Sequence, residues 1–231
     1  MGFDFNVIWD NFSYFFIGRY PKGPLGGVGL TLYLAAVGLI LSFLGGLVLG
    51  LLSISRNRVI RWASSSIIQI IRGMPLLMVI FWMFFLLPAL FGAGMSASAT
   101  VITALTLFTS AYMSEIVRAG IMGIPKGQTE AAVSTGLTHR QTMVYVILPQ
   151  ALRNMIPSFV NQFVSMIKDT SLAFIVGVAE LTQIATQVNN RTMLFPTEIF
   201  IFIAVIYFVL CFAFTELSRW LERRLAYTKS I

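Results

Sequence analysis

The sequence predicts an all-α integral membrane protein with five transmembrane helices. Hydrophobic residues make up 57% of the 231 residues, the mean hydropathy is +0.83, and only 11% of residues are charged, whereas a soluble domain carries about a quarter. A helix needs about 20 mostly apolar residues to cross the hydrocarbon layer. Five stretches meet this need, at residues 25–53, 62–91, 98–120, 156–179 and 196–217. The full length of 231 residues gives room for one compact membrane domain.

Residues 1–24 precede the first span and are expected to lie at the extracytoplasmic face of the membrane. Asp4 and Asp10 stand where a cleaved signal peptide would carry basic residues. Aromatic rings prefer the interface between lipid and water. The segment holds five of them: Trp9, Phe12, Tyr14, Phe15 and Phe16.

The Lys and Arg residues predict the orientation, because they accumulate on the cytoplasmic side. Three lie on one side of the five spans, namely Arg19, Lys22 and Arg191. Eleven lie on the other side: Arg56, Arg58, Arg61, Arg118, Lys126, Arg140, Arg153, Arg219, Arg223, Arg224 and Lys229. The amino terminus is therefore predicted outside. The membrane domain covers 25–220, and a loop at 121–155 and a tail at 221–231 lie in the cytoplasm. Because the net charge of +7 is scattered between apolar runs, it favours membrane orientation over nucleic-acid binding.

The second predicted span contains both a charge and a helix break. Ser65, Gln69 and Arg72 recur at spacings of four and three, which places them on one helical face. The next three residues, 73–75, read Gly-Met-Pro, and proline removes a backbone donor. A helix interrupted at membrane depth is tolerated where it lines a cavity.

The fourth predicted span carries Lys168 and Asp169 near its middle. A charge in the membrane costs about 2.5–3.5 kcal/mol on insertion scales, so it marks a candidate functional site. The two side chains point about 100° apart on a helix and cannot face each other. We therefore expect nine residues to line a substrate pathway: Arg72, Gly73, Met74, Pro75, Met78, Lys168, Asp169, Thr170 and Ser171. The alternative is that Arg72, Lys168 and Asp169 only tie helices together in buried ion pairs.

Two further patterns predict packing. Glu115 and Arg118 are three residues apart in the third span and can pair along one helix. Gly46 and Gly50 form a G-x-x-x-G pattern in the first span, which lets helices approach closely.

The loop at 121–155 is far longer than a connection between two helices requires. Its content of helix formers and apolar residues is too high for a disordered tail. Pro125 and Pro149 are expected to frame a short helical pair within it.

The loop contains Glu130-Ala131-Ala132, then Gly136 after three residues, then Val146-Ile147-Leu148-Pro149 after nine more. In these residues and spacings it resembles the EAA loop of bacterial ABC importer permeases. The family pattern has isoleucine where this chain has Val146. Three further segments are similar to the branch that imports polar amino acids: IIRGMPLL at 70–77, AYMSEIVRAGI at 111–121 and KDTSL at 168–172. The resemblance covers about residues 25–225 and implies a type I ABC importer fold.

The resemblance also implies partners and roles. The loop would form a coupling helix that docks on a separate ATP-binding cassette ATPase, through Glu130, Ala131, Ala132, Gly136, Arg140, Leu148 and Pro149. Small residues there would leave a flat helix surface. A second permease, identical or a sister subunit, and a periplasmic binding protein would complete an importer in the bacterial inner membrane. Its cargo would be a polar L-amino acid, with glutamate or aspartate favoured and basic or amide amino acids as alternatives.

The sequence lacks the motifs of an energy-coupling or catalytic site. It contains no GxxxxGK[ST] loop for ATP and no GxSxG or HExxH motif, and it has one His and one Cys. The chain is therefore expected to be no enzyme and to hold no cofactor, with ATP and Mg²⁺ on the partner ATPase. An ion-coupled secondary transporter or channel is the rival function.

Overall fold

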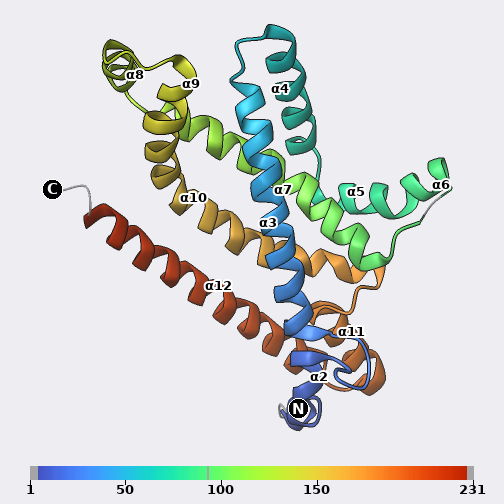
Figure 1. Ribbon diagram of the computed structural model, residues 1–231. Coiled ribbons are helices and arrows are strands. Elements are labelled where there is room, and N and C mark those ends of the chain that lie inside the picture. Colours follow the sequence, from blue (N-terminus) through green and yellow to red (C-terminus); the bar gives the residue numbers. More distant parts are fainter. Residues whose placement is uncertain (1–4, 93, 228–231) are drawn as a thin grey trace. The chain divides into compact units, whose positions relative to one another are not determined.

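The computed structural model describes residues 5–92 and 94–227, and Figure 1 shows their helices in chain order. Asp4 in the predicted amino-terminal segment and Lys229 in the predicted tail lie outside the described residues. The helices are α1 (Asn6–Asp10), α2 (Phe12–Ile17), α3 (Gly27–Ser53), α4 (Arg58–Arg72), α5 (Leu76–Phe81), η1 (Trp82–Leu86), α6 (Leu87–Phe91), α7 (Ala97–Met122), α8 (Lys126–Ser134), α9 (His139–Gln141), η2 (Thr142–Ile147), α10 (Leu148–Asp169), η3 (Thr170–Val176), α11 (Leu181–Thr192) and α12 (Pro196–Tyr227). Of these, η1 and η2 are π-helices and η3 is a 3₁₀-helix.

The chain divides into two compact units, each described here by itself. Unit 1 comprises Met1–Ile40, Met74–Thr106 and Phe163–Phe214. Unit 2 comprises Leu41–Gly73, Leu107–Gln162 and Thr215–Ile231.

Three helices among the described residues are long and apolar enough to cross a membrane: α3, α7 and the Pro196–Leu217 part of α12. They match the first, third and fifth predicted spans. The second predicted span is interrupted between α4 and α5, and it counts as a fourth crossing only if the two parts form one span. The fourth predicted span is more polar than expected, since α10 does not pass the same test and continues as η3. The count of five spans and their orientation stay predictions.

The interruption after Arg72 is confirmed. The α4 helix closes with the Gly73 amide donating to the carbonyls of Gln69 and Ile70. Pro75 then caps α5 with an extended ψ of 136°. Because a proline ring disfavours the helical conformation of the residue before it, Met74 cannot continue α4 into α5.

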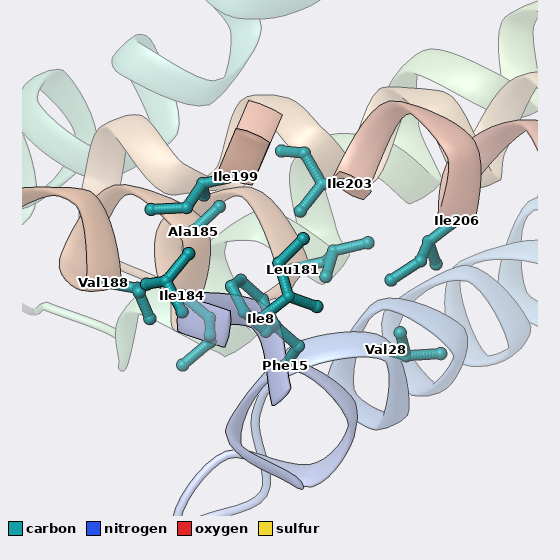
Figure 2. Packing of buried hydrophobic residues seen from close by; sticks show 11 residues of the cluster. Ile8, Phe15, Val28, Leu181, Ile184, Ala185, Val188, Ile199, Ile203 and Ile206 are labelled. Atoms are coloured by element: carbon teal, nitrogen blue, oxygen red, sulfur yellow. The ribbon is translucent and has the colours of Figure 1, made fainter. Parts of the chain in front are cut away.

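Unit 1 has a core of branched apolar side chains, shown in Figure 2. Leu181, Ile184 and Val188 recur along one face of α11, at the spacing of a single helical stripe. Against this stripe lie the fully buried Phe15 of α2 and side chains from the start of α12. The predicted interfacial segment therefore contributes to the core through Phe15, while Trp9 remains 70% exposed.

Unit 2 has a second core between α7 and the last part of the loop, formed by η2 and the start of α10. Val117 and Ile121 of α7 pack with Ile147, Ala151 and Met155. This cluster anchors the loop helices to α7.

Both π-helices lie directly before a Leu-Pro pair, Leu87-Pro88 after η1 and Leu148-Pro149 after η2. A proline inside a helix lacks a donor, and its ring clashes with the carbonyl four residues earlier. A π-turn adds one residue and moves that carbonyl away. Each helix thus continues through its proline without ending.

Candidate functional site

The predicted coupling helix is α8, which begins after Pro125. Within it Glu130 and Ala131 are exposed, whereas Ala132 is only 6% exposed and lies against the chain itself. The flat surface of small residues predicted from the sequence is therefore reduced on α8 to Ala131.

Gly136 lies beyond the end of α8 and does not contribute to a helix surface. Its φ is +86°, in the left-handed region that glycine adopts without strain. Its amide donates to the carbonyl of Val133, and the Leu137 amide donates to that of Ala132. These two bonds are a Schellman motif, which satisfies the last carbonyls of the helix. Gly136 thus ends α8, which corrects the expectation that it forms part of a flat helix surface, while its contact with an ATPase stays a prediction.

The loop continues through α9 and η2 into α10. Thr138 and Gln141 form a reciprocal capping box at the start of α9. Arg140 is exposed there, as expected of a residue available to a partner. Leu148 is half-buried and Pro149 is exposed, but both lie inside a continuous helical segment. The prediction that Pro149 closes the helical pair is wrong, because the π-turn of η2 accommodates it.

Arg72 lies in a charged cluster in unit 2 with two residues of α7. Its Nη1 is 3.9 Å from Glu115 Oε2, and its guanidinium carbon is 5.2 Å from the centre of the Tyr112 ring. Arg118 donates to the same Oε2, from Nε at 3.1 Å and from Nη2 at 2.7 Å. The predicted pair of Glu115 and Arg118 is confirmed, and Arg72 is its more distant third member.

A cavity of about 500 Å³ opens beside this cluster. It is lined by Arg72 and by one face each of α7 and α10: Tyr112, Glu115, Ile116, Ala119, Gly120, Asn154, Met155, Ser158 and Gln162. On α10, Asn154, Ser158 and Gln162 recur every four positions and Met155 lies next to Asn154, so one helical face supplies the lining residues. Such a volume falls within the range of small-molecule pockets, about 300–1,000 Å³.

The second predicted group, Lys168 to Ser171, lies in unit 1 where α10 tightens into η3. Lys168 is exposed and Asp169 is half-buried. Neither takes part in an ion pair within residues 5–92 and 94–227. The hydroxyls of Thr170 and Ser171 donate back to the carbonyls of Ile167 and Lys168, at 2.7 and 2.6 Å.

Part of the predicted pathway comes together within unit 1. Helix α5, which carries Met78, packs against η3, which carries Thr170 and Ser171. Met78 is 46% exposed. Met74 and Pro75 belong to the same unit, while Arg72 and Gly73 belong to unit 2.

Sequence reasoning missed Glu180, which is fully buried in unit 1 at the start of α11. Its carboxylate accepts hydrogen bonds from the amides of Thr182 and Gln183, each at 2.8 Å, and from the Tyr207 hydroxyl at 2.9 Å. The sequence offered one sign of this helix cap: Glu180 directly precedes a segment, α11, with apolar residues at helical spacing. Glutamate, however, is not among the residues that usually cap a helix amino terminus.

Sequence reasoning also missed the polar face of α10. Asn154, Ser158 and Gln162 recur at helical spacing, which is the signal that could have identified it. In the part of the chain that the structure describes, no group of three His, Cys, Asp or Glu side chains could hold a metal ion.

Apolar helices, an interrupted crossing and charged side chains beside a cavity of mixed polar and apolar lining indicate a membrane transport protein. A family model described as binding-protein-dependent transport system inner membrane component matches residues 42–227. The chain belongs to this family, and it is an amino-acid ABC importer permease.

Three similar proteins agree with this assignment. The probable glutamine ABC transporter permease protein GlnP of Bacillus subtilis is 41% identical, over 90% of this chain and 98% of its own. The L-cystine transport system permease protein TcyB of the same species is also 41% identical, over 87% of this chain and 85% of its own. The crystal structure of an amino acid ABC transporter with histidines superposes with a TM-score of 0.86 and 35% identity, covering 97% of this chain and all of the other.

These findings confirm the predicted all-α type I importer fold and the multi-pass location in the inner membrane. Permease subunits of ABC transporters are not catalytic, and ATP is hydrolysed on a partner ATPase. The two relatives are named for glutamine and L-cystine, so they lend no support to glutamate or aspartate as the cargo.

Proposed function

We propose that this permease moves a polar L-amino acid received from a periplasmic binding protein, with glutamine as the favoured cargo. The similarity to a permease named for glutamine, over nearly the full length of both chains, carries this proposal. Glutamate and aspartate, predicted from the sequence, are the second candidates. The charges near the pathway suit the α-carboxylate of any amino acid and do not separate these cargoes.

The proposed pathway is lined by Arg72 to Pro75, Met78 and Lys168 to Ser171. Lys168 and Asp169 support it, because they carry charge at the end of α10 without an ion pair among the described residues. Charges that only tied helices together would be paired. The helix break at 73–75 supports it as well, since such breaks supply free backbone groups to a ligand.

The proposed coupling surface is formed by α8, α9 and the turn between them. Glu130, Ala131 and Arg140 are exposed and available to the ATPase. Ala132 and Gly136 act indirectly, by seating α8 on the chain and by ending it. Closure of the ATPase subunits on ATP would carry the docked loop with it, as a rigid-body switch between two states.

A complete importer would contain two permeases, because each chain has one coupling loop and two ATPase subunits need one each. The second permease would be another copy of this chain or a sister subunit.

The test is ATP-driven uptake by the complex reconstituted in liposomes with its binding protein. Radiolabelled L-glutamine, L-glutamate and L-aspartate are compared at equal concentrations, and glutamine is expected to enter fastest. Asp169→Asn and Arg72→Gln are expected to lower uptake and substrate-stimulated ATP hydrolysis at least about tenfold, because each removes a charge from the pathway. Arg58→Gln, at the exposed start of the same helix as Arg72, is the matched control and keeps both activities.

Two results would overturn parts of this proposal. Normal uptake with both Asp169→Asn and Arg72→Gln would exclude the pathway. Uptake by liposomes that contain the permease alone would exclude ATP coupling and favour an ion-coupled transporter.

A further inference from the structure

Three basic residues of unit 1 lie on the side of the membrane that disfavours them. Lys and Arg accumulate on the cytoplasmic side of membrane proteins, yet Arg19, Lys22 and Arg191 lie on the predicted extracytoplasmic side. All three are exposed. None of them forms an ion pair within residues 5–92 and 94–227. Their charge is therefore available to an anion from outside the chain.

A closed loop at residues 18–26 holds two of these basic residues directly before the first span, α3. The Gly26 amide donates to the Ile17 carbonyl at 3.1 Å. Gly18 pairs with Leu25 in an antiparallel bridge. The α3 helix has 27 residues and so a length of about 40 Å, whereas the hydrocarbon layer is about 30 Å thick. The ends of α3 therefore reach the polar head groups, which places the loop at the depth of the lipid phosphates.

A small pocket opens between this loop and α11. Its volume is about 220 Å³, and Arg19 of the loop, Tyr14 of α2 and Gln187 of α11 lie in its wall. Helix α2 packs against α11 within unit 1 (Figure 1). Because the pocket is smaller than typical small-molecule sites, which measure about 300–1,000 Å³, it fits a compact group such as a phosphate.

The polar groups around the pocket can donate to an anion. The Tyr14 hydroxyl donates to Gln187 Oε1, and within the described residues the Gln187 amide nitrogen makes no hydrogen bond. One turn further along α11, the guanidinium carbon of Arg191 lies 5.2 Å from the centre of the Tyr14 ring. A guanidinium group has five N–H donors and no acceptor. Two arginines and an amide thus present donors from the loop and from α11.

The surroundings of the pocket favour a lipid as the source of the phosphate. Trp9, Phe12 and Tyr20 are exposed, and tryptophan and tyrosine rings prefer the interface between lipid and water. A choline or ethanolamine head group would bring a further cation towards three basic residues. An anionic phospholipid brings only negative charge, and its phosphate accepts charge-assisted hydrogen bonds from guanidinium groups.

We propose that this pocket binds the phosphate group of an anionic phospholipid, with Arg19, Arg191 and Gln187 as donors. Lys22 adds positive charge on the same loop, which attracts an anionic head group. The bound lipid joins the 18–26 loop to α11 and so fixes the amino-terminal segment of the permease. The site goes beyond the proposed function, because it does not depend on which amino acid is carried.

Quenching of tryptophan fluorescence by brominated lipids tests the site in the purified permease–ATPase complex in nanodiscs. Tyr20→Trp places an indole in the loop beside Arg19, and its signal is the difference from the wild-type complex. Bromine quenches an indole only at close range, so the signal reports the lipid next to the loop. Brominated phosphatidylglycerol is expected to quench at least about threefold more strongly than brominated phosphatidylcholine at the same mole fraction.

Three pairs of substitutions, each added to Tyr20→Trp, assign the preference to the pocket. Arg19→Gln with Arg191→Gln is expected to bring the two lipids to equal quenching. Arg56→Gln with Arg153→Gln is the matched control, because it removes two exposed cations from unit 2 and should keep the preference. Arg19→Lys with Arg191→Lys keeps both charges and should keep at least half of it. If the lysine pair abolishes the preference as fully as the glutamine pair does, the arginines only maintain the loop structure and the proposal is wrong.

The same assay separates a lipid from the other possible ligands. The preference is expected to be equal in sodium phosphate and in sodium chloride of the same ionic strength. Its loss in phosphate alone would make free phosphate the ligand and overturn the proposal. Equal quenching by both lipids with the native arginines would leave only a general contact with the membrane. Protection of the indole from both lipids by added binding protein would assign the basic loop to that protein instead.

Discussion

Gly46 of α3 faces Met113 of α7 so closely that a methyl group on Gly46 would overlap the Met113 Cβ atom. One turn further on, a Cβ at Gly50 would lie 2.7 Å from the Val117 Cβ. The two glycines of the G-x-x-x-G pattern thus form one surface on which α7 packs within unit 2. Close packing of this kind stabilises helix pairs in membranes, where lipid removes the hydrophobic drive between helices.

Replacement of Gly46 by alanine is expected to destabilise the permease by about 1–3 kcal/mol, because the added methyl group forces the two helices apart. The measurement is the thermal unfolding midpoint of the purified complex in detergent. Gly127→Ala is the matched control, since a Cβ at Gly127 meets no atom within 4 Å. A Gly46→Ala midpoint equal to that of Gly127→Ala would contradict the close packing.

Replacement of Gly136 is expected to impair coupling through the backbone conformation and not through a steric clash. A Cβ there would meet no atom within 4 Å, yet φ is +86°. Alanine should cost about 1–2 kcal/mol in this left-handed conformation, whereas asparagine tolerates it better. We expect Gly136→Ala to lower uptake per ATP hydrolysed, and Gly136→Asn to keep most of it. If Gly136→Ala and Gly136→Asn lower uptake per ATP equally, the loss comes from contact of the new side chain with the docked ATPase and not from backbone strain.

Pro149 is expected to maintain the π-turn of η2, which sets the rotation of α9 and η2 relative to α10 along the same continuous helical segment. Alanine at 149 restores a backbone donor, so an ordinary α-helix can extend back through residues 142–147. Loss of one residue from the turn rotates the preceding segment by about 100°. Pro149→Ala should therefore leave ATP hydrolysis intact and reduce uptake per ATP. Pro88→Ala removes the equivalent proline after η1, outside the loop, and should not change this ratio.

Glu180 should make the stability of the permease depend on pH. Burial raises the pKa of Glu180 to about 7, although hydrogen bonds from Thr182, Gln183 and Tyr207 oppose the rise. In the unfolded chain a glutamate titrates near pH 4.3. Between these values the folded state binds more protons than the unfolded state, so stability falls as the pH rises from about 4 to about 7.

The measurement for Glu180 is the change in the unfolding midpoint between pH 5 and pH 8. The wild-type midpoint is expected to fall further than that of Glu180→Gln, because glutamine stays neutral at both pH values. Other titrating groups are common to both proteins and cancel in the comparison. A fall of equal size in the two proteins would show that Glu180 does not titrate in this range.

The sequence by itself determined the membrane class, the first, third and fifth apolar helices, the break after Arg72 and the transporter family. These features depend on local composition and spacing: an apolar run long enough to cross lipid forms a helix wherever it lies, and Pro75 breaks a helix whatever surrounds it. The loop motif could be recognised for the same reason, since its residues lie within twenty positions of one another.

Only the tertiary structure decided where Ala132, Gly136 and Pro149 lie in the loop, and that Arg72 faces Glu115 beside a cavity lined by α10. Ala132 is buried because of what packs on it, and the left-handed φ of Gly136 becomes visible only with the folded backbone. In the sequence, Arg72 is more than forty residues from Glu115, and Glu115 is more than forty residues from Gln162. Periodicity shows which residues share a helical face, but not which face of a distant helix they meet, because that depends on packing throughout the unit.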